Sequence, residues 1–405
     1  NTAFNQKLYL IINQCFLKHF GDLALKMSQF AGHCRFVWNK VLSLNLARLK
    51  EKQGIIWYGE ADYWSKVWKR SEEFSFLKDA PAHCIQQKLR DLAKAFKDAF
   101  DKNQPSKRIP KPRKRGVHDS FRFPEPKHIE LNGRQVKLPK LGWIHLFKSQ
   151  DIVGVVKNAT VTKHAGHWYI SIQTEIDIEI PSHPANTAVG IDVGVSKLFA
   201  LSDGTTKEPL NSFKKHQNKL AKLQRRLSKK KKFSSGWQKQ KVKIQKLHAK
   251  IANCRKDYLH KSTTEFSKNH AMIVIEDLQI SNMSKSAKGD MEQPGRNVKA
   301  KSGLNKSILD QGWYEARRQL EYKQKWRGGD LLAVPAKYTS QKCSCCGHVD
   351  KESRGSQSEF CCTKCGFALN ADINAAKNIL AAGHAVLAGG AEPLGAAVKP
   401  EPLAA

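Results

Sequence analysis

The sequence predicts a multidomain α+β protein of 405 residues. Short runs of alternating apolar and polar residues fill 120–180 and are typical of antiparallel strands in a small barrel. Apolar strands are predicted at 188–194 and 271–278, and a segment with helical spacing follows at 370–380. Strands and helices that alternate in this way indicate a second, α/β type of domain.

The amino-terminal part is predicted to be a helical module. Residues 22–50 and 81–100 show helical periodicity, with a boundary at Gly32 in the first segment. The stretch 55–78 between them contains seven aromatic residues. These aromatics could form a core or offer platforms on which bases stack, and both interpretations stay open.

The net charge indicates a polyanionic partner. The chain has 70 Lys and Arg against 36 Asp and Glu, a formal charge of +34. Such an excess repels itself in a compact free protein, and nucleic acid neutralises it. The sequence contains no apolar run of the length that a spanning helix needs, and no clean signal-peptide pattern. We therefore expect a soluble, cytoplasmic protein.

Two segments concentrate the positive charge. Residues 105–116 hold three prolines and six basic residues without an acid, so we expect an extended strap that lies along a phosphate backbone, or else a solvated linker. Between Lys214 and Lys256 there are 17 Lys and Arg and no acid. Apolar residues at helical spacing predict a helical hairpin here, with its bend at 234–236 and a basic exterior that binds nucleic acid.

Three acidic residues are the candidate catalytic groups. Asp192 stands between Gly190 and Gly194 on the face of its strand opposite the apolar side chains, and an Asp-Gly turn at 203–204 makes 188–204 a strand pair. The buried strand at 271–278 ends in Glu276 and Asp277.

Asp372 falls in the first turn of the predicted helix, after the possible N-cap Asn370. Carboxylates from two strands and a helix suit two Mg²⁺ ions that clamp the attacking and leaving oxygens of a phosphodiester. Taken singly, each acid could instead be a cap, a turn residue or an ion-pair partner.

A cysteine cluster predicts a structural zinc site. Six of the ten cysteines lie between 343 and 365, which favours a metal over disulfides. The pairs C-x-x-C at Cys343 and Cys346 and at Cys362 and Cys365 are each followed by glycine, and four thiolates leave a zinc ion no open position. Cys345 and Cys361 are spare.

The remaining segments connect these features. Residues 281–306 are polar and broken by Gly and Pro, which indicates a flexible loop. A helix is predicted from Leu309 to Trp326, a short strand at 330–335, and a disordered tail at 383–405 that is rich in Ala, Gly and Pro.

Several motifs together closely resemble the TnpB (OrfB) family of insertion-sequence proteins, which is related to the type V CRISPR effector nucleases. The similarity runs from about Gly32 to Ala376 and is more specific in the carboxyl half. The motifs are Gly32-x-x-Arg35-Phe-Val-Trp-Asn39, Gly190-Ile-Asp-Val-Gly194, Ile275-Glu-Asp-Leu278, Thr339-Ser-Gln-Lys-Cys-Ser-Cys-Cys-Gly347, Cys362-Thr-Lys-Cys-Gly366 and Asn370-Ala-Asp-Ile-Asn-Ala-Ala376.

The resemblance implies a domain layout. It assigns an RNase H-like (RuvC) nuclease domain with Asp192, Glu276 and Asp372 as catalytic acids that hold two Mg²⁺ ions. Cys343, Cys346, Cys362 and Cys365 would hold one Zn²⁺. The implied domains are a wedge-like β-barrel (1–25 and 105–184), a helical recognition domain (26–104), the nuclease domain (185–338 and 367–382) with its basic hairpin (213–268), and a zinc ribbon that binds target nucleic acid (339–366).

The resemblance also implies an activity and partners. The protein would be an RNA-guided DNA endonuclease that cuts double-stranded target DNA beside a short flanking motif, because pairing with a guide RNA can carry the sequence specificity. The guide RNA would come from the transposon end. The protein would act as a monomer in the ribonucleoprotein and would be associated with the nucleoid when on DNA. A single centre would cut both strands. The alternatives are an RNA-guided regulator of transposition without cleavage, and a transposase that joins DNA ends.

Overall fold

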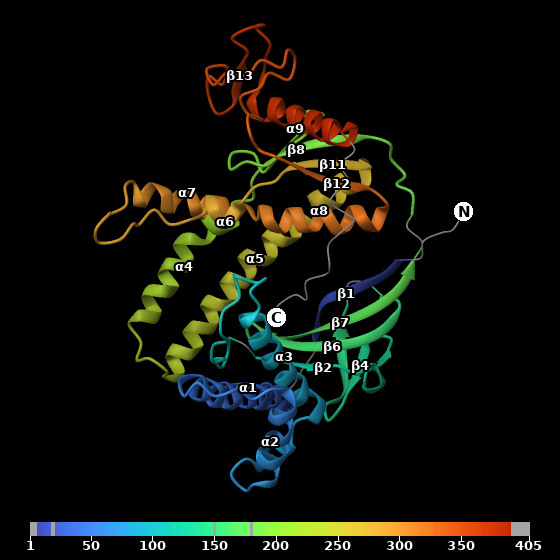
Figure 1. Ribbon diagram of the computed structural model, residues 1–405, viewed down its shortest axis with the longest axis vertical. Helices are drawn as coiled ribbons and strands as arrows, with labels where there is room; N and C mark the ends of the chain where they lie inside the picture. Colours follow the sequence, from blue (N-terminus) through green and yellow to red (C-terminus); the bar gives the residue numbers. More distant parts are fainter. Residues whose placement is uncertain (1–5, 18–20, 118, 149–150, 179–180, 390–405) are drawn as a thin grey trace. The chain divides into compact units, whose positions relative to one another are not determined.

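The computed structural model describes residues 6–17, 21–117, 119–148, 151–178 and 181–389. The chain divides into two compact units, the first reaching residue 178 and the second covering 181–389 of the described residues (Figure 1). None of the helices in these ranges combines the length and the apolar character needed to cross a membrane.

The first unit is built on an antiparallel sheet of seven strands in the order β2-β6-β7-β1-β5-β4-β3. The strands of the predicted barrel are present, and its closure stays a prediction, because the pairings between described residues run from β2 to β3 without joining these two. The strands are β1 (Gln6–Leu17), β2 (Ser120–Phe123), β3 (Glu130–Asn132), β4 (Gln135–Leu138), β5 (Gly142–Phe147), β6 (Val155–His164) and β7 (His167–Ile178).

Three α-helices pack with this sheet around one hydrophobic core. They are α1 (Gly21–Lys50), α2 (Tyr58–Arg70) and α3 (Ala82–Phe100), with the short 3₁₀ helices η1 (Ser75–Lys78) and η2 (Pro126–His128) beside them. Phe30 of α1 meets Phe121 of β2 edge to face at 5.7 Å, and both belong to the same buried cluster. The predicted wedge and recognition domains therefore share a core, and their division stays a prediction.

Two details of this unit differ from the sequence analysis. The predicted boundary at Gly32 is wrong, because α1 runs through it. An added Cβ at Gly32 would lie 3.7 Å from the Arg35 side chain, an ordinary contact, so no close packing requires glycine there. Among the aromatics of 55–78, Trp68 is buried in the core whereas Tyr63 is 61% exposed, and base stacking by the exposed ones stays a prediction.

The strap at 105–116 has no helix or strand, as predicted, and it is fastened to α1. Asn39 and Arg113 exchange two hydrogen bonds, of 3.0 and 2.8 Å, between the Asn39 amide group and the Arg113 backbone. The Arg113 guanidinium also lies 3.9 Å from the centre of the Trp38 ring. The strap is thus a docked segment and not a freely solvated linker.

The second unit contains a sheet of five strands in the order β10-β9-β8-β11-β12. The strands are β8 (Ala188–Asp192), β9 (Phe199–Leu201), β10 (Thr206–Lys207), β11 (Met272–Glu276) and β12 (Asp330–Val334). Strands β8, β11 and β12 are parallel, whereas β9 and β10 run antiparallel to their neighbours. The predicted strand pair at 188–204 is confirmed, because β8 and β9 pair antiparallel, and the predicted Asp203-Gly204 turn leads from β9 into β10.

Helices cover both faces of this sheet. The apolar face of β8 and β11, with Val189, Ile191 and Ile275, shares a core with helices α5 (Ser235–Asn269) and α8 (Trp313–Arg327). Helix α9 (Ala371–Ala388) packs on the opposite face, where Val274 and Ile379 form a smaller cluster. Figure 1 shows α9 and α8 on either side of the strands.

The basic hairpin consists of α4 (Ser212–Ser228) and α5, joined by residues 229–234. Leu220, Leu247 and Ile251 are buried along its seam. The predicted bend at 234–236 is wrong by a few residues, because the Ser234 hydroxyl accepts a hydrogen bond from the Trp237 backbone N–H and caps α5.

Three further predictions need correction. The segment 281–306 is only partly a loop, because α6 (Ile280–Met283) overlaps its start and α7 (Val298–Gln311) begins inside it. The helix predicted from Leu309 to Trp326 is two helices, since Gly312 adopts a left-handed conformation with φ 75° and separates α7 from α8. The predicted tail at 383–405 is helical up to Ala388, and residues 390–405 lie outside the described residues.

Candidate functional site

Asp192 and Glu276 lie side by side at the ends of neighbouring strands. Ile275 pairs with Ile191 in the parallel ladder between β11 and β8, so the next residue on each strand is the acid. Side chains alternate along a strand, and Ile191 and Ile275 belong to the apolar face. The two carboxylates therefore lie toward the face that α9 covers.

Gly190 brings α9 close to this pair of acids. A Cβ at Gly190 would lie 2.2 Å from the Ala376 carbonyl oxygen and 2.6 Å from the Leu380 backbone nitrogen, so the helix backbone rests directly on β8. Asp372 is one helical turn before Ala376, and Asp192 is two residues beyond Gly190 on the same face of the strand. The close approach at Gly190 thus brings Asp372 toward Asp192.

The helix that carries Asp372 starts where the sequence predicts. The Asn370 side-chain oxygen accepts hydrogen bonds from the backbone N–H groups of Asp372 and Ile373, at 3.1 and 3.3 Å. This N-cap fixes the first turn of α9, and the positive end of the helix dipole favours an acid there.

The electrostatics of Asp192 reflect a crowded acidic site. Burial, followed by the negative charges of Glu276 and Asp372, raises the pKa of the Asp192 carboxyl to about 7 from its usual 3.8. Both other acids therefore act on Asp192. Burial also raises the pKa values of Glu276 and Asp372. Three carboxyl groups that are each costly to ionise form a site whose charge a bound cation would compensate.

Two residues that contact the acids were not predicted from the sequence as site residues. The Thr339 hydroxyl donates a 2.5 Å hydrogen bond to Glu276 Oε1. Arg354 Nη2 lies 3.6 Å from Asp372 Oδ1 and lowers the pKa of that carboxyl, although burial outweighs it. Thr339 belongs to the motif that precedes the cysteines and could have been found there, whereas no local pattern marks Arg354.

The three acids are less tightly grouped than the four cysteines described below. Among the described residues, the groups of three or more metal-binding side chains whose ligand atoms all lie within 4.8 Å of one another do not include the three acids. Oxygen donors of this kind suit Mg²⁺.

Asp277, the other acid at the end of β11, is turned to a different partner. Its Oδ1 accepts a hydrogen bond of 2.5 Å from Arg317 Nη1, and its side chain is half exposed. Asp277 is thus an ion-pair partner on the surface of α8 and serves as an internal comparison for Glu276.

The four predicted cysteines form one cluster. The sulfur atoms of Cys343 and Cys365 are 3.8 Å apart, those of Cys346 and Cys362 are 3.6 Å apart, and all four lie within 4.8 Å of one another. Tetrahedral zinc with bonds of about 2.3 Å places sulfurs about 3.8 Å apart, so the group is compatible with zinc. Cys345 and Cys361 lie outside this group, so the chosen register is compatible with the structure and stays a prediction.

Glycine makes both cysteine turns possible. Gly347 and Gly366 have φ values of 75° and 72°, a left-handed conformation that favours glycine. Each donates its backbone N–H to the carbonyl oxygen of the first cysteine of its pair, at 3.0 Å. Strands β13 (Glu359–Cys361) and β14 (Ala368–Asn370) complete the ribbon.

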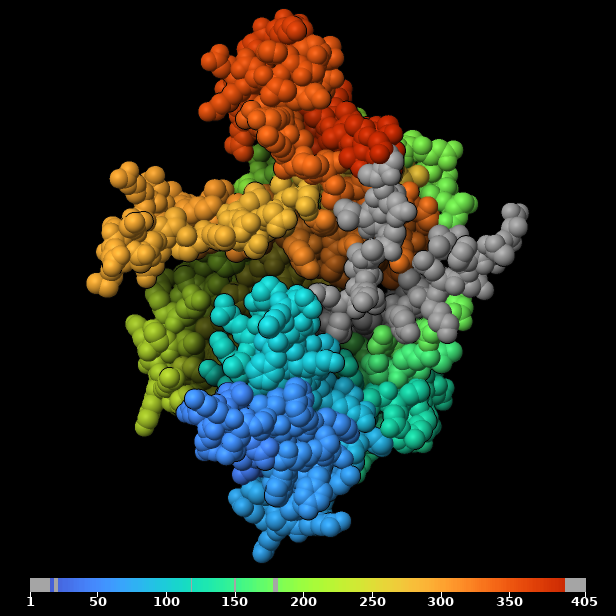
Figure 2. Space-filling view, in the orientation of Figure 1, coloured from blue at the N-terminus to red at the C-terminus, as the bar shows by residue number. Residues whose placement is uncertain are grey.

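The ribbon is fastened to α9 beside the acids. Asn374 donates to the Lys342 carbonyl oxygen at 2.8 Å and accepts from the Ser344 backbone N–H at 3.0 Å. Asn378 donates to the carbonyl oxygens of Thr339 and Lys342, at 2.9 and 2.6 Å. These bonds hold Thr339, and hence its contact with Glu276. Figure 2 shows the ribbon packed against α9, at the red end of the colour bar.

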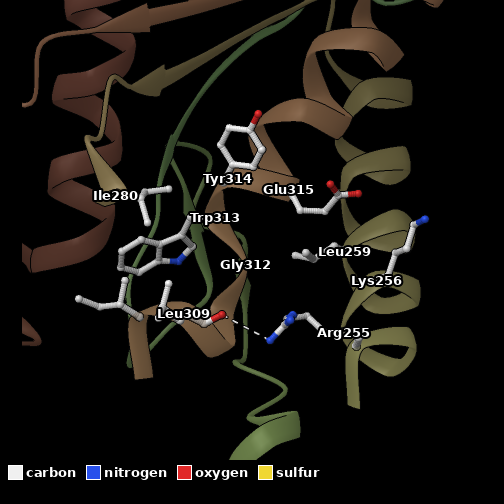
Figure 3. A pocket seen from close by; sticks show the side chains of 11 residues that line it. Arg255, Lys256, Leu259, Ile280, Leu309, Gly312, Trp313, Tyr314 and Glu315 are labelled. Atoms are coloured by element: carbon white, nitrogen blue, oxygen red, sulfur yellow. Dashed lines mark hydrogen bonds between the residues drawn. The ribbon is translucent and has the colours of Figure 1, made fainter. Parts of the chain in front are cut away.

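Two apolar cavities lie beside helix α8. One, of about 350 Å³, is lined by side chains of β8, β11 and α8 and reaches Glu276. The other, of about 340 Å³, lies between α5 and the start of α8. In Figure 3, Trp313 and Tyr314 border it on one side and Arg255 on the other, where the guanidinium donates to the Leu309 carbonyl oxygen at 3.4 Å.

Comparisons with known proteins place these features in context. A family model described as "Probable transposase" (OrfB_IS605) matches residues 171–287. A "Cas12f1-like, TNB domain" model matches 313–379. A "Helix-turn-helix domain" model matches 23–54. In the structure, residues 23–50 of this match lie in the single helix α1 and the last four follow its end.

Named relatives cover most of the chain. The chain is 56% identical over 370 residues to "Putative RNA-guided DNA endonuclease InsQ" of Escherichia coli (strain K12), covering 91% of each protein. It is 32% identical over 381 residues to "Putative RNA-guided DNA endonuclease" of Streptomyces pristinaespiralis, covering 91% of this chain and 88% of the other. A 71-residue stretch is 41% identical to "CRISPR-associated endodeoxyribonuclease Cas12f1" of Sulfoacidibacillus thermotolerans, 17% of each chain.

Proposed function

Because the chain belongs to the OrfB (TnpB) family of insertion-sequence proteins, we propose that it is an RNA-guided DNA endonuclease with a single hydrolytic centre at Asp192, Glu276 and Asp372. The observation that carries this proposal is the convergence of the three acids on one face of the sheet, where Asp192 and Glu276 follow a paired position of neighbouring strands and the contact at Gly190 brings the helix of Asp372 close. Relatives that cover nine-tenths of the chain carry the name of that activity.

The order of the second sheet supports an RNase H-like assignment of the nuclease domain. Three antiparallel strands followed by two parallel ones, with β8 central, display Asp192 beside Glu276. Helix α9 then supplies Asp372 from a position more than 90 residues further along the chain. Sites in sheets of this kind lie at the carboxyl ends of parallel strands, as here.

The three acids would hold two Mg²⁺ ions, which supply charge stabilisation and an activated water when bound. Asp192 would hold them together with the other two acids, whose charges both act on it. Thr339 orients the Glu276 carboxylate by donating a hydrogen bond to one of its oxygens. Arg354 lies 3.6 Å from Asp372, so its guanidinium would neutralise that carboxylate while no ion is bound and compete with a bound cation.

The basic surfaces would bind the nucleic acids. On the hairpin of α4 and α5, the residues from Lys214 to Lys256 expose a run of cations without an acid. Guide RNA and double-stranded target DNA are the proposed partners, with sequence read by base pairing and backbones held by charge. A single centre would cut the two strands in turn, and the ribbon would contact target nucleic acid. We propose a monomeric ribonucleoprotein.

The substitution Asp192→Ala tests the centre. Guided cleavage should fall at least 1,000-fold, on the order of 4 kcal/mol of transition-state stabilisation, while the affinity for guide RNA stays unchanged. Asp277→Ala is the matched control, because it removes the neighbouring acid that pairs with Arg317, and it should retain cleavage.

Retained cutting by the Asp192 variant would overturn the assignment of the centre. Guided binding of DNA by the unchanged protein, without nicking in the presence of Mg²⁺, would instead favour the RNA-guided regulator of transposition. Covalent joining of DNA ends would favour the transposase.

A further inference from the structure

Two histidines and a glutamate meet on the first unit, outside the centre proposed above. His83 is the second residue of α3, Glu125 precedes η2, and His128 ends η2. His83 Nδ1 lies 3.2 Å from Glu125 Oε1, and His128 Nε2 lies 3.5 Å from Glu125 Oε2. One ligand atom from each of the three lies within 4.8 Å of the others, a closeness that the described acids of the second unit do not reach.

The histidine rings are arranged around the carboxylate. Their centres are 5.1 Å apart and their planes are inclined by 39°. His128 Nε2 is buried and makes no hydrogen bond, although it lies 3.5 Å from Glu125 Oε2. This nitrogen is therefore available to coordinate a metal ion. The three side chains remain 35–40% exposed, which leaves a path for an ion and a position for water.

The backbone that carries these residues is held in place by the core. Cys84 and Ile85 follow His83 and are fully buried, and Ile129 follows His128 and is 7% exposed. All three belong to the hydrophobic cluster that joins α3 to the sheet. The ligands thus come from two elements 42 residues apart (83 to 125) that the fold already brings together. A site that the fold has already assembled in this way needs little structural reorganisation to bind a metal ion.

We propose that His83, Glu125 and His128 form a binding site for a divalent transition metal, with Zn²⁺ as the expected ion. Imidazole nitrogens suit Zn²⁺ and Ni²⁺, whereas Mg²⁺ prefers oxygen donors. Three protein ligands leave a fourth position for water. The ion would join the start of α3 to the connection between β2 and β3.

Lys127 competes for the same carboxylate. Its Nζ lies 2.9 Å from Glu125 Oε2, and this hydrogen bond, together with the charges of His83, Lys127 and His128, lowers the pKa of Glu125. The Lys127 side chain is 70% exposed and can move away. The ion pair weakens the site without blocking it, so the loss of Lys127 should strengthen metal binding.

The test is a zinc titration of the full-length protein, prepared with the cysteine cluster already loaded. One further Zn²⁺ per chain should bind, and Mg²⁺ in excess should not displace it. The double substitution His83→Ala/His128→Ala should weaken this second binding event at least tenfold, and so should Glu125→Gln, which keeps the shape of the side chain. Lys127→Met should tighten it several-fold.

The matched control is His164→Ala/His167→Ala. These two histidines pair across the hairpin of β6 and β7 in the same unit, so the double variant removes as many imidazoles and should retain the second zinc. Melting temperatures without added metal should equal that of the unchanged protein, and added zinc should raise them only where the three ligands are present.

The proposal is overturned if no second zinc binds, or if the His83, His128 and Glu125 variants bind it as the unchanged protein does. Should the double variant fail to fold, the Glu125→Gln and Lys127→Met titrations decide. None of these measurements depends on DNA cleavage, so they stand apart from the nuclease assignment.

Discussion

The two candidate metal sites of the second unit differ in how the chain builds them. The four cysteines lie within 23 residues (343–365), and each pair closes its own turn at a glycine. The three acids span 181 residues (192–372), and only the sheet and α9 bring them together. The first site is a property of local spacing, whereas the second is a property of the fold. Each should therefore fail in a different way when it is altered.

The largest expected effect is the loss of zinc from the ribbon. Replacing a buried ligand by Cys362→Ser should reduce the zinc content by one ion per chain and unfold residues 339–366, because the binding of structural zinc is worth roughly 10–16 kcal/mol. Proteolysis should then cut within the ribbon while the sheet of β8 and β11 stays protected. Zinc analysis and limited proteolysis measure both outcomes.

The spare cysteines provide the control for this experiment. Cys345→Ser and Cys361→Ser alter neighbouring residues that lie outside the cluster. Both variants should keep their zinc and resist proteolysis. Zinc loss from either one would show that the register of the four ligands is wrong.

The next effect concerns the contact that assembles the acids. Gly190→Ala should lower the free energy of unfolding by roughly 3 kcal/mol, because the added Cβ would lie 2.2 Å from the Ala376 carbonyl oxygen and must push α9 away from β8. Cleavage should fall as well, since Asp372 moves with α9, while the zinc content should not change. Denaturant unfolding and a cleavage assay test this.

Gly303→Ala is the matched control in the same unit. Gly303 lies within α7, and an added Cβ would meet nothing within 4 Å. Alanine there should stabilise the protein by about 0.5–1 kcal/mol. If Gly190→Ala were equally harmless, α9 would not rest on β8 as described.

These two sites also mark how far the sequence could predict the structure. The spacing of the cysteines predicted which four form one group, because the geometry of each C-x-x-C turn is local. Alternation along the strand identified the face of Asp192, and the N-cap identified the start of α9. The approach of α9 to Gly190 could not be predicted, because it depends on how a helix packs over a strand some 180 residues earlier.

Where prediction failed, the cause was tertiary packing. The boundary expected at Gly32 is absent, because α1 buries a continuous stripe against the core and glycine costs a helix only about 1 kcal/mol. The break at Gly312 was overlooked because apolar spacing continues across it. Arg354 was not recognised as a site residue, since only the folded ribbon brings it to Asp372.

The dependence of stability on pH tests the raised pKa of Asp192 in the acidic site. The folded chain holds the Asp192 proton more tightly than the unfolded chain does, so this contribution to stability is present below pH 3.8 and is lost as the pH rises through about 7. Without Mg²⁺, Asp192→Asn should therefore be more stable than the unchanged protein at pH 8, by on the order of 2–4 kcal/mol. At pH 4 the two should differ little.

Denaturant unfolding at several pH values provides the measurement, and Mg²⁺ provides the control. Saturating Mg²⁺ should remove or reverse the difference at pH 8, because only the unchanged protein retains all three carboxylates. A difference that does not vary with pH would show that Asp192 is ionised at its ordinary pKa and is not crowded by Glu276 and Asp372.

The smallest expected effect concerns the ion pair between Arg354, which follows the first cysteine pair, and Asp372 of the acidic site. Arg354 comes from the ribbon and lies 3.6 Å from Asp372, where it competes with a bound cation. Because the guanidinium is partly exposed, the ion pair is worth about 0.5–1 kcal/mol. Arg354→Ala should therefore lower the Mg²⁺ concentration for half-maximal cleavage by roughly two- to fivefold.

Arg318→Ala, which breaks an ion pair with Glu315 on α8, is the control and should leave that concentration unchanged. If Arg354→Ala instead abolished cleavage at every Mg²⁺ concentration, Arg354 would act on the scissile phosphate, and the ribbon would complete the nuclease centre in addition to supporting it.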